Sequence, residues 1–129
     1  MTQEELNGLA RKILDAAFRV HTALGPGLLE TAYTACLVYE LRKMGLEVRT
    51  EVPVPIVYDG TKLTDVGYRI DILVSNEIVL EIKSVDALAP VHFSQITSYL
   101  KLANRRLGFL LNFNVESLRD GIHRRVHRF

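Results

Sequence analysis

Two acids and a lysine lie close together near the middle of the chain, in the stretch YRIDILVSNEIVLEIKS at residues 68–84. Asp71 precedes a short polar segment, and Glu81 and Lys83 follow it. Two carboxylates side by side suit a divalent cation such as Mg²⁺ or Mn²⁺, which prefers oxygen ligands. A lysine beside them can polarise a water molecule or bind an anionic oxygen next to the cation. The residue types indicate a metal site, and a structural ion pair between Lys83 and one acid is the alternative.

The stretch predicts a β-hairpin that would bring these side chains together. Residues 75–77 are turn-forming or polar, and runs rich in Ile, Leu and Val flank them. If these three residues form the loop, Val74 faces Ile78 and Asp71 lies directly opposite Glu81. Directly opposed residues have Cβ atoms roughly 4.5–5.5 Å apart, and like charges so placed destabilise a sheet. The pair therefore indicates a function rather than a contribution to folding.

Alternation along the two strands predicts one mixed face and one apolar face. The mixed face carries Asp71, Glu81 and Lys83 together with Leu73 and Val79. Strands this apolar are expected in the middle of a sheet that is covered on both sides. The apolar face is predicted to consist of Ile70, Ile72, Val74, Ile78, Leu80 and Ile82.

Two helices are predicted before the hairpin. The first begins with a capping box at residues 2–5 and runs from about Gln3 to Leu24. Gly25-Pro26-Gly27 ends it, and the second runs from about Leu28 to Met44. Glu30 stands in the first turn of the second helix, where the helix dipole favours an acid. The alternative is that Glu30 projects toward the hairpin as a third acid.

The remaining segments predict the rest of an α/β sheet. Residues 46–58 alternate between polar and apolar side chains, and two prolines place this strand at an edge because proline cannot donate to a ladder. A helix is expected from Pro90 to about Ala103. Because this helix forms a crossover, the apolar run 107–113 should pair parallel to the third strand. The end of the chain, GIHRRVHRF, is consistent with one more short strand.

Length and composition restrict the class of protein without naming a partner. The chain has 129 residues, the size of one domain, and a net charge of +1. Its N-terminus lacks the apolar core of a signal peptide, and no run reaches the length of a membrane span. The one cysteine, Cys36, permits no internal disulfide, which fits a reducing cytoplasm. Cys36 lies between apolar neighbours in a helical pattern and is expected to be a small core residue.

The order of these elements and four motifs resemble the PD-(D/E)XK nuclease superfamily. The motifs are Asp71, Glu81-Ile82-Lys83, Gln95 with Tyr99, and the segment GLLETAY at residues 27–33. The last of these matches the signature of the GxxExxY family, a branch of that superfamily. The resemblance covers nearly the whole chain and implies a single nuclease-like domain over residues 1–129. One departure is Ile70, which stands where the superfamily often has proline, a position that varies freely there.

The resemblance implies a restriction-endonuclease-like α/β core. Such a core would contain two N-terminal helices and a three-stranded antiparallel meander. A crossover helix would follow, and then one or two further strands, the first of them parallel to the third strand of the meander.

The resemblance also implies a role for each motif residue. Asp71 and Glu81 would bind Mg²⁺ or Mn²⁺ together with the backbone carbonyl of Ile82. Lys83 would position the attacking water or stabilise the charge that develops on phosphate. Glu30 would match the acid that the superfamily often supplies from its first core helix, and would complete the metal shell or bind a second ion. Gln95 would match the glutamine that approaches the site from the helix after the motif strand.

Basic residues make the C-terminal quarter a candidate nucleic-acid surface. Arginine side chains there can contact phosphates. The alternative is that they protect a terminal edge strand from aggregation. The candidates for phosphate contact are Arg105, Arg106, Arg124, Arg125 and Arg128.

Three functions remain open at this point. The first is a metal-dependent nuclease that hydrolyses phosphodiester bonds of nucleic acid, with DNA as the expected substrate, acting as a homodimer or with a partner protein to cut both strands. The second is a non-catalytic nucleic-acid-binding or regulatory module that retains the nuclease fold. The third is a metal-independent interaction protein whose acids form structural salt bridges.

Overall fold

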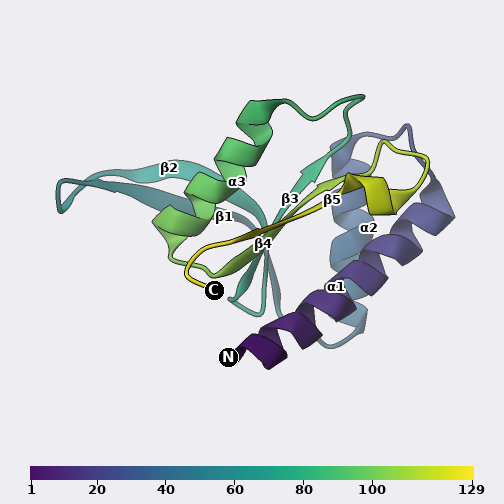
Figure 1. The fold of residues 1–129 in the computed structure, drawn as a ribbon, viewed down its shortest axis with the longest axis horizontal. Coiled ribbons are helices and arrows are strands. Elements are labelled where there is room, and N and C mark those ends of the chain that lie inside the picture. The colour runs from purple at the N-terminus through teal and green to yellow at the C-terminus, as the bar shows by residue number, and fades with distance from the viewer.

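The computed structural model describes residues 1–129 as a five-stranded sheet flanked by helices (Figure 1). In chain order the elements are α1 (Gln3–Leu24), α2 (Glu30–Lys43), β1 (Val48–Tyr58), β2 (Thr61–Val74), β3 (Ile78–Lys83), α3 (Pro90–Ala103), β4 (Leu107–Asn112), the short 3₁₀ helix η1 (Leu118–Gly121) and β5 (Ile122–Val126). The strands lie side by side in sequence order. Strands β1, β2 and β3 are antiparallel, β4 is parallel to β3, and β5 is antiparallel to β4. The predicted restriction-endonuclease-like α/β arrangement is confirmed.

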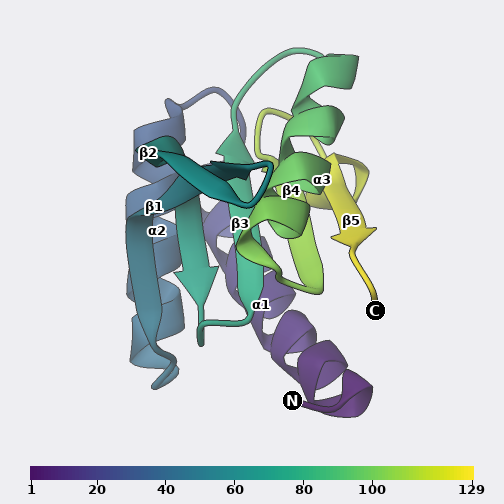
Figure 2. The ribbon, with the colours of Figure 1, turned by 90° about the vertical axis from the view of Figure 1, so that its left-hand side faces the viewer.

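Helices α1 and α2 cover one face of the sheet and α3 covers the other (Figures 1 and 2). Side chains of β3 alternate between these faces, as predicted. Ile78, Leu80 and Ile82 join the larger core with α1 and α2, whereas Val79 packs with Leu100 of α3. None of the three helices combines the length and the hydropathy that a membrane span requires.

One residue of the predicted apolar face packs elsewhere. The hairpin pattern places Ile70 with Ile72, but Ile70 belongs to the smaller cluster with Leu73 and Val79. Strand β2 pairs with β3 only over residues 72–74, whereas it pairs with β1 along most of its length. Two-stranded ribbons twist more strongly than wider sheets. The alternation inferred from the hairpin therefore does not extend to Ile70.

Helix α2 begins two residues later than predicted. The hydroxyl of Tyr33 accepts a hydrogen bond from the Leu28 N–H at 3.1 Å and donates one to the Gly25 carbonyl at 2.6 Å. These contacts hold the preceding loop outside the helix, so that Glu30 becomes its first residue. Leu29, which lies inside the predicted helix, is the extended N-cap residue and is 77% exposed.

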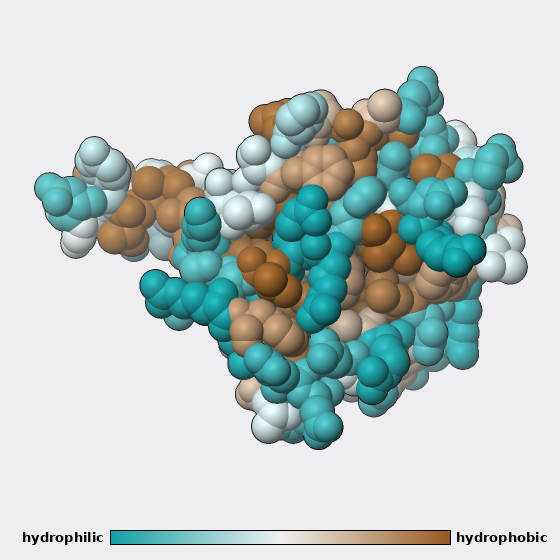
Figure 3. Space-filling model, viewed as in Figure 1, coloured by the Kyte–Doolittle hydropathy of each residue, from teal (hydrophilic) through white to brown (hydrophobic).

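Strands β1 and β2 continue beyond the sheet as a two-stranded arm, seen at the left of Figure 1. Strand β1 is an edge strand, as its two prolines predict. The pairing of β1 with β2 shifts register on both sides of Ile56. A Cβ on Gly67 would lie only 2.0 Å from Cγ1 of Ile56, so this position requires glycine. Figure 3 shows apolar side chains among the polar ones on the arm. The exposed apolar residues of the arm are Val57, Tyr58, Leu63 and Val66.

The buried side chain of Asn112 ties the end of β4 to the chain that leaves β3. Asn112 pairs in register with Lys83. Its Oδ1 accepts hydrogen bonds from the N–H groups of Val85 and Asn114 at 3.1 and 3.2 Å, and its Nδ2 donates to the Val85 carbonyl at 2.9 Å. The side chain thereby fixes the backbone just after Lys83.

Replacing Asn112 by alanine should lower the free energy of unfolding by about 2 kcal/mol, because the backbone N–H and carbonyl of the half-buried Val85 would lose their partners. For a chain of this size the melting temperature should fall by roughly 6–10 °C. Circular-dichroism melts measure this directly. Asn114→Ala is the matched control: Asn114 bonds the exposed Asp86, and its loss should change stability by no more than about 0.5 kcal/mol. Equal melting temperatures for the two variants would contradict the role assigned to Asn112.

Candidate functional site

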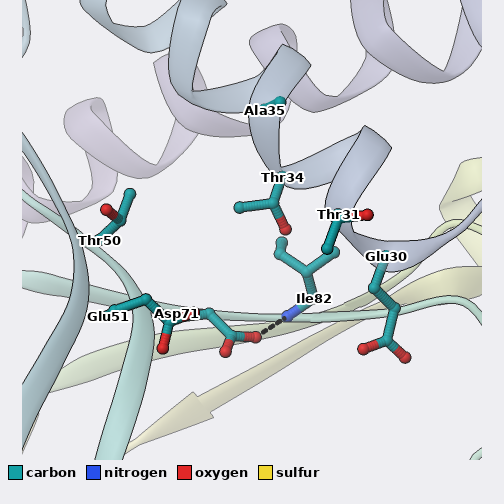
Figure 4. A pocket seen from close by; sticks show the side chains of 8 residues that line it. All are labelled: Glu30, Thr31, Thr34, Ala35, Thr50, Glu51, Asp71 and Ile82. Carbon is teal, nitrogen blue, oxygen red and sulfur yellow. Dashed lines mark hydrogen bonds between the residues drawn. The ribbon is translucent and has the colours of Figure 1, made fainter.

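Asp71 and Glu81 lie where strands β2 and β3 separate. The last backbone pair is Ile72 with Leu80, which makes Asp71 and Glu81 the next opposed residues, as predicted. Side chains replace the backbone ladder at this point. The Asp71 N–H donates to Glu81 Oε1 at 3.3 Å. The Ile82 N–H donates to Asp71 Oδ2 at 2.9 Å, the bond drawn in Figure 4. Each carboxylate is thus oriented by a backbone amide of the opposite strand.

Burial makes Glu81 an unusual acid. The residue is 6% exposed. Burial, with a further contribution from the charge of Asp71, raises the pKa of Glu81 from its ordinary value of 4.5 to about 9, although the charge of Lys83 opposes the shift. In the absence of a cation, Glu81 therefore keeps its proton at neutral pH. A cation bound to the pair would have to displace that proton.

The stability of the metal-free protein should fall as pH rises between about 4.5 and about 9. Within this window the folded state holds the proton of Glu81 and the unfolded chain releases it. The contribution is complete below the lower value and is lost as pH passes the upper one. Denaturant unfolding in EDTA across the window should show a steeper fall for the parent than for Glu81→Gln, which cannot ionise there. Parallel curves for the two proteins would show that Glu81 ionises normally.

Lys83 lies two residues beyond Glu81 on the same strand and is half-buried. The four ion pairs of the structure join other residues, and none includes Asp71, Glu81 or Lys83. The structural ion pair considered from the sequence therefore has no contact to support it. Lys83 acts on Glu81 at longer range, since its charge opposes the rise in the pKa of that acid.

A pocket opens between the N-terminus of α2 and the base of the arm (Figure 4). It is lined by Glu30, Thr31, Thr34, Ala35, Thr50, Glu51, Asp71 and Ile82. Glu30 and Asp71 lie on either side of Ile82, and Glu51 lies beyond Asp71. The carboxylate of Glu30 accepts a hydrogen bond from the Ser84 N–H at 3.3 Å, and the Ser84 hydroxyl donates to the Leu28 carbonyl. Ser84, which directly follows Lys83, thus joins the end of β3 to the loop before α2 and to Glu30.

Glu51 is a pocket residue that the sequence reasoning missed. Its neighbours Thr50 and Val52 pair with residues 72 and 70, so Glu51 falls opposite Asp71 with a φ of 50°. The position of Glu51 opposite Asp71 follows only from the register in which β1 pairs with β2. No group of three or more His, Cys, Asp or Glu side chains comes together in a way that could hold a metal ion. The acids brought into contact are the pair Asp71 and Glu81, and Glu30 and Glu51 remain around the pocket.

Helix α3 approaches the acids from the other face. Gln95 is half-buried on this helix. Tyr99 stacks on Tyr68 with ring centroids 4.1 Å apart, and the Tyr68 hydroxyl donates to the Tyr99 carbonyl at 2.9 Å. Burial raises the pKa of Tyr99, and the charges of Glu81 and Asp71 raise it further. The Tyr68–Tyr99 stack therefore lies within electrostatic range of the acids, a neighbour that the sequence reasoning did not identify.

The arginines predicted to contact phosphates are divided between different parts of the molecule. Arg124 donates to Asn7 of α1 on one face of the sheet, whereas Arg125 lies over the ring of Phe93 of α3 on the other. Arg106 donates to the Met1 carbonyl near the N-terminus. Arg105 donates to Asn76 in the β2–β3 loop, and Arg128 stands in the C-terminal tail.

A family model described as the PD-(D/E)XK nuclease superfamily matches residues 7–126. The matched segment includes every residue that lines the pocket and both members of the acid pair. No curated protein and no solved structure gives a significant match.

Proposed function

We propose that this chain, which belongs to the PD-(D/E)XK nuclease superfamily, is a metal-dependent nuclease that hydrolyses phosphodiester bonds of nucleic acid, with DNA as the favoured substrate. The observation that carries the proposal is the acid pair: Asp71 and Glu81 meet where two strands separate, and neither has an ion-pair partner. Opposed like charges are costly in a sheet unless a cation joins them. We further propose one nuclease-like domain over residues 1–129 and, from residues 27–33, membership of the GxxExxY branch.

The donor set fits a hard divalent cation. Each carboxylate uses one oxygen for a backbone amide, which leaves Asp71 Oδ1 and Glu81 Oε2 without a hydrogen bond from the protein. Mg²⁺ and Mn²⁺ are bound by one or two carboxylates and several waters. In this proposal the backbone carbonyl of Ile82 is a third ligand, and Glu30 completes the shell or binds a second ion.

The chain's own residues would divide the chemistry as follows. A bound Mg²⁺ or Mn²⁺ supplies Lewis acidity and a template for the phosphate. Lys83 holds the attacking water or neutralises charge on a phosphate oxygen from its place beyond Glu81. Gln95 approaches the same phosphate from α3. Glu81 releases its proton when the cation binds, so metal affinity should increase with pH.

Incubation with labelled nucleic acids tests the proposal. Single-stranded, double-stranded and branched DNA, and RNA, would each be incubated with the purified chain in Mg²⁺, in Mn²⁺ and in EDTA. We expect cleavage with either cation and none with EDTA. One site cuts one strand, so cutting through a duplex would need a second copy or a partner protein. Binding without cleavage under every condition would favour the alternative, a non-catalytic nucleic-acid-binding or regulatory module.

Replacing Arg124 and Arg125 by alanine should weaken DNA binding and reduce its salt dependence. Each lost phosphate contact on duplex DNA lowers the slope of log affinity against log salt by about 0.9, because fewer counterions are released. Fluorescence anisotropy at several salt concentrations measures the slope. Arg11→Ala, which removes an exposed charge on α1, is the control. An unchanged slope would assign both arginines to protection of the β5 edge.

A further inference from the structure

A groove lies between the base of the arm and the last turn of α3. Its floor is apolar: Val52 and Ile70 form a buried base. Pro53 and Leu102 are the exposed apolar residues that line it. The only charged residues that line it are Arg49 and Arg105, and no acid does. Leu102, in the last turn of α3, is 44% exposed. The groove therefore combines exposed apolar surface with positive charge.

The groove adjoins the pocket of the acids but has the opposite charge. Adjacent residues of the same strands divide between the two: Glu51 and Asp71 line the acidic pocket, whereas Val52 and Ile70 line the groove. A ligand in the groove would therefore lie next to the strands that carry the acid pair.

The positive charge of the groove is not neutralised within the protein. Neither arginine takes part in any of the ion pairs. The guanidinium of Arg105 is held by the Ala103 carbonyl at 2.8 Å and Asn76 Oδ1 at 2.9 Å, and its Nε is buried without a hydrogen-bond partner. Arg49 is exposed and makes no side-chain hydrogen bond of its own. Arg105 is thus a fixed cation and Arg49 a free one.

We propose that this groove binds a single-stranded segment of the nucleic acid substrate, with phosphates against Arg49 and Arg105 and unstacked bases against the apolar floor. The inference rests on the proposed function and names the structural class of its substrate. A duplex stacks the faces of its bases and presents only phosphates and base edges. An apolar floor therefore buries no base face when it contacts a duplex. Unpaired bases expose apolar faces that such a floor can bury.

The Tyr68–Tyr99 stack connects the groove to the acids. Burial raises the pKa of Tyr68, the charge of Glu81 raises it further, and the charge of Arg105 lowers it. The hydroxyl of Tyr68 therefore lies within electrostatic range of both Glu81 and Arg105. In this proposal a strand bound in the groove extends past Tyr68 toward the carboxylates, and we expect the cut to fall beside the single-stranded segment.

Binding in EDTA tests the groove independently of catalysis. Fluorescence anisotropy would compare a labelled single-stranded oligo-dT with a blunt duplex of the same length. We expect the single strand to bind more tightly. Arg49→Ala should weaken its binding about tenfold and reduce the salt slope by about 0.7, the value for one phosphate contact on a single strand. Leu102→Gln should weaken it about three- to tenfold, because a base contact is lost.

Two matched variants serve as controls, and both should bind oligo-dT like the parent. Arg11→Ala removes an arginine from α1, and Val91→Gln replaces an exposed apolar residue at the other end of α3. Melting curves should show parental stability for Arg49→Ala and Leu102→Gln, since both residues are exposed.

Either of two binding results would overturn the proposal: equal or tighter binding of the blunt duplex, or parental binding of oligo-dT by both Arg49→Ala and Leu102→Gln. Displacement of oligo-dT by polyglutamate at equal concentration would also overturn it, because that result would assign the groove to an acidic protein. A parallel cleavage assay in Mn²⁺ separates this failure from failure of the nuclease assignment. Cleavage by the parent together with parental binding by both variants refutes the proposed binding groove but leaves the nuclease assignment in place. Weakened binding by both variants without any cleavage by the parent supports the groove and refutes the nuclease activity.

Discussion

Cleavage by the Lys83→Ala variant should be slower than cleavage by the parent by a factor of about 10²–10³, the cost of removing one preorganised charge from a site where negative charge develops. Lys83 has no ion-pair partner, so its charge is available to the attacking water or the phosphate. Glu81→Gln should reduce metal-dependent cleavage at least as much, because a neutral amide replaces a metal-binding oxygen. Initial rates on the best substrate in saturating Mn²⁺ measure both effects.

Both variants should stay folded, which allows the loss to be assigned to chemistry. Glutamine has the shape of the protonated glutamate that the raised pKa of Glu81 indicates. Lys83 forms no ion pair that its replacement would break. Lys12→Ala on α1 is the matched control and should cleave at the parental rate. Parental, EDTA-resistant cleavage by either purified site variant would rule out the assignment of these residues.

The register of the β2–β3 hairpin could be predicted from the sequence because local features determine it. The short polar loop and the two apolar runs permit one pairing, and Val74 does face Ile78. That register places Asp71 opposite Glu81, and the parallel pairing of β4 follows from the crossover helix. The acid pair at the centre of the site was therefore accessible from local spacing alone.

Residues around the pair depend on contacts that spacing does not encode. Glu51 enters the pocket only because β1 pairs with β2 in one register, and that register belongs to an arm with no third strand at its outer end. The twist of the same arm moves Ile70 into the smaller cluster. The stack of Tyr68 on Tyr99 joins residues 31 positions apart through tertiary packing.

The position of Glu30 depends partly on local sequence and partly on tertiary contacts. The stop signal before α2 predicted an acid in the first turn of that helix, and Glu30 is its first residue. What orients it is tertiary: Tyr33 holds the loop through Gly25 and Leu28, and Ser84 donates to the carboxylate. The hydroxyl of Tyr33 and the backbone of Ser84 give a physical reason for the spacing of Glu30 and Tyr33 in the segment at residues 27–33.

Asp71→Asn should separate a metal site from a structural charge pair. Two full charges at about 5 Å repel by about 3 kcal/mol at an effective dielectric constant near 20, before the proton on Glu81 or the charge of Lys83 offsets this. Asparagine keeps the shape and can still accept the hydrogen bond from the Ile82 N–H. The metal-free variant should therefore be at least as stable as the parent at neutral pH.

Thermal melts of the parent and of Asp71→Asn, each in EDTA and in Mn²⁺, test the metal site most directly. Mn²⁺ at about 100 times its dissociation constant should stabilise the parent by about 2.7 kcal/mol, which raises its melting temperature by roughly 10 °C. Asp71→Asn should lose most of this rise, and Asp15→Asn, an exposed acid on α1, should keep it. A variant that is less stable than the parent in EDTA, with no response of either protein to Mn²⁺, would contradict the metal site.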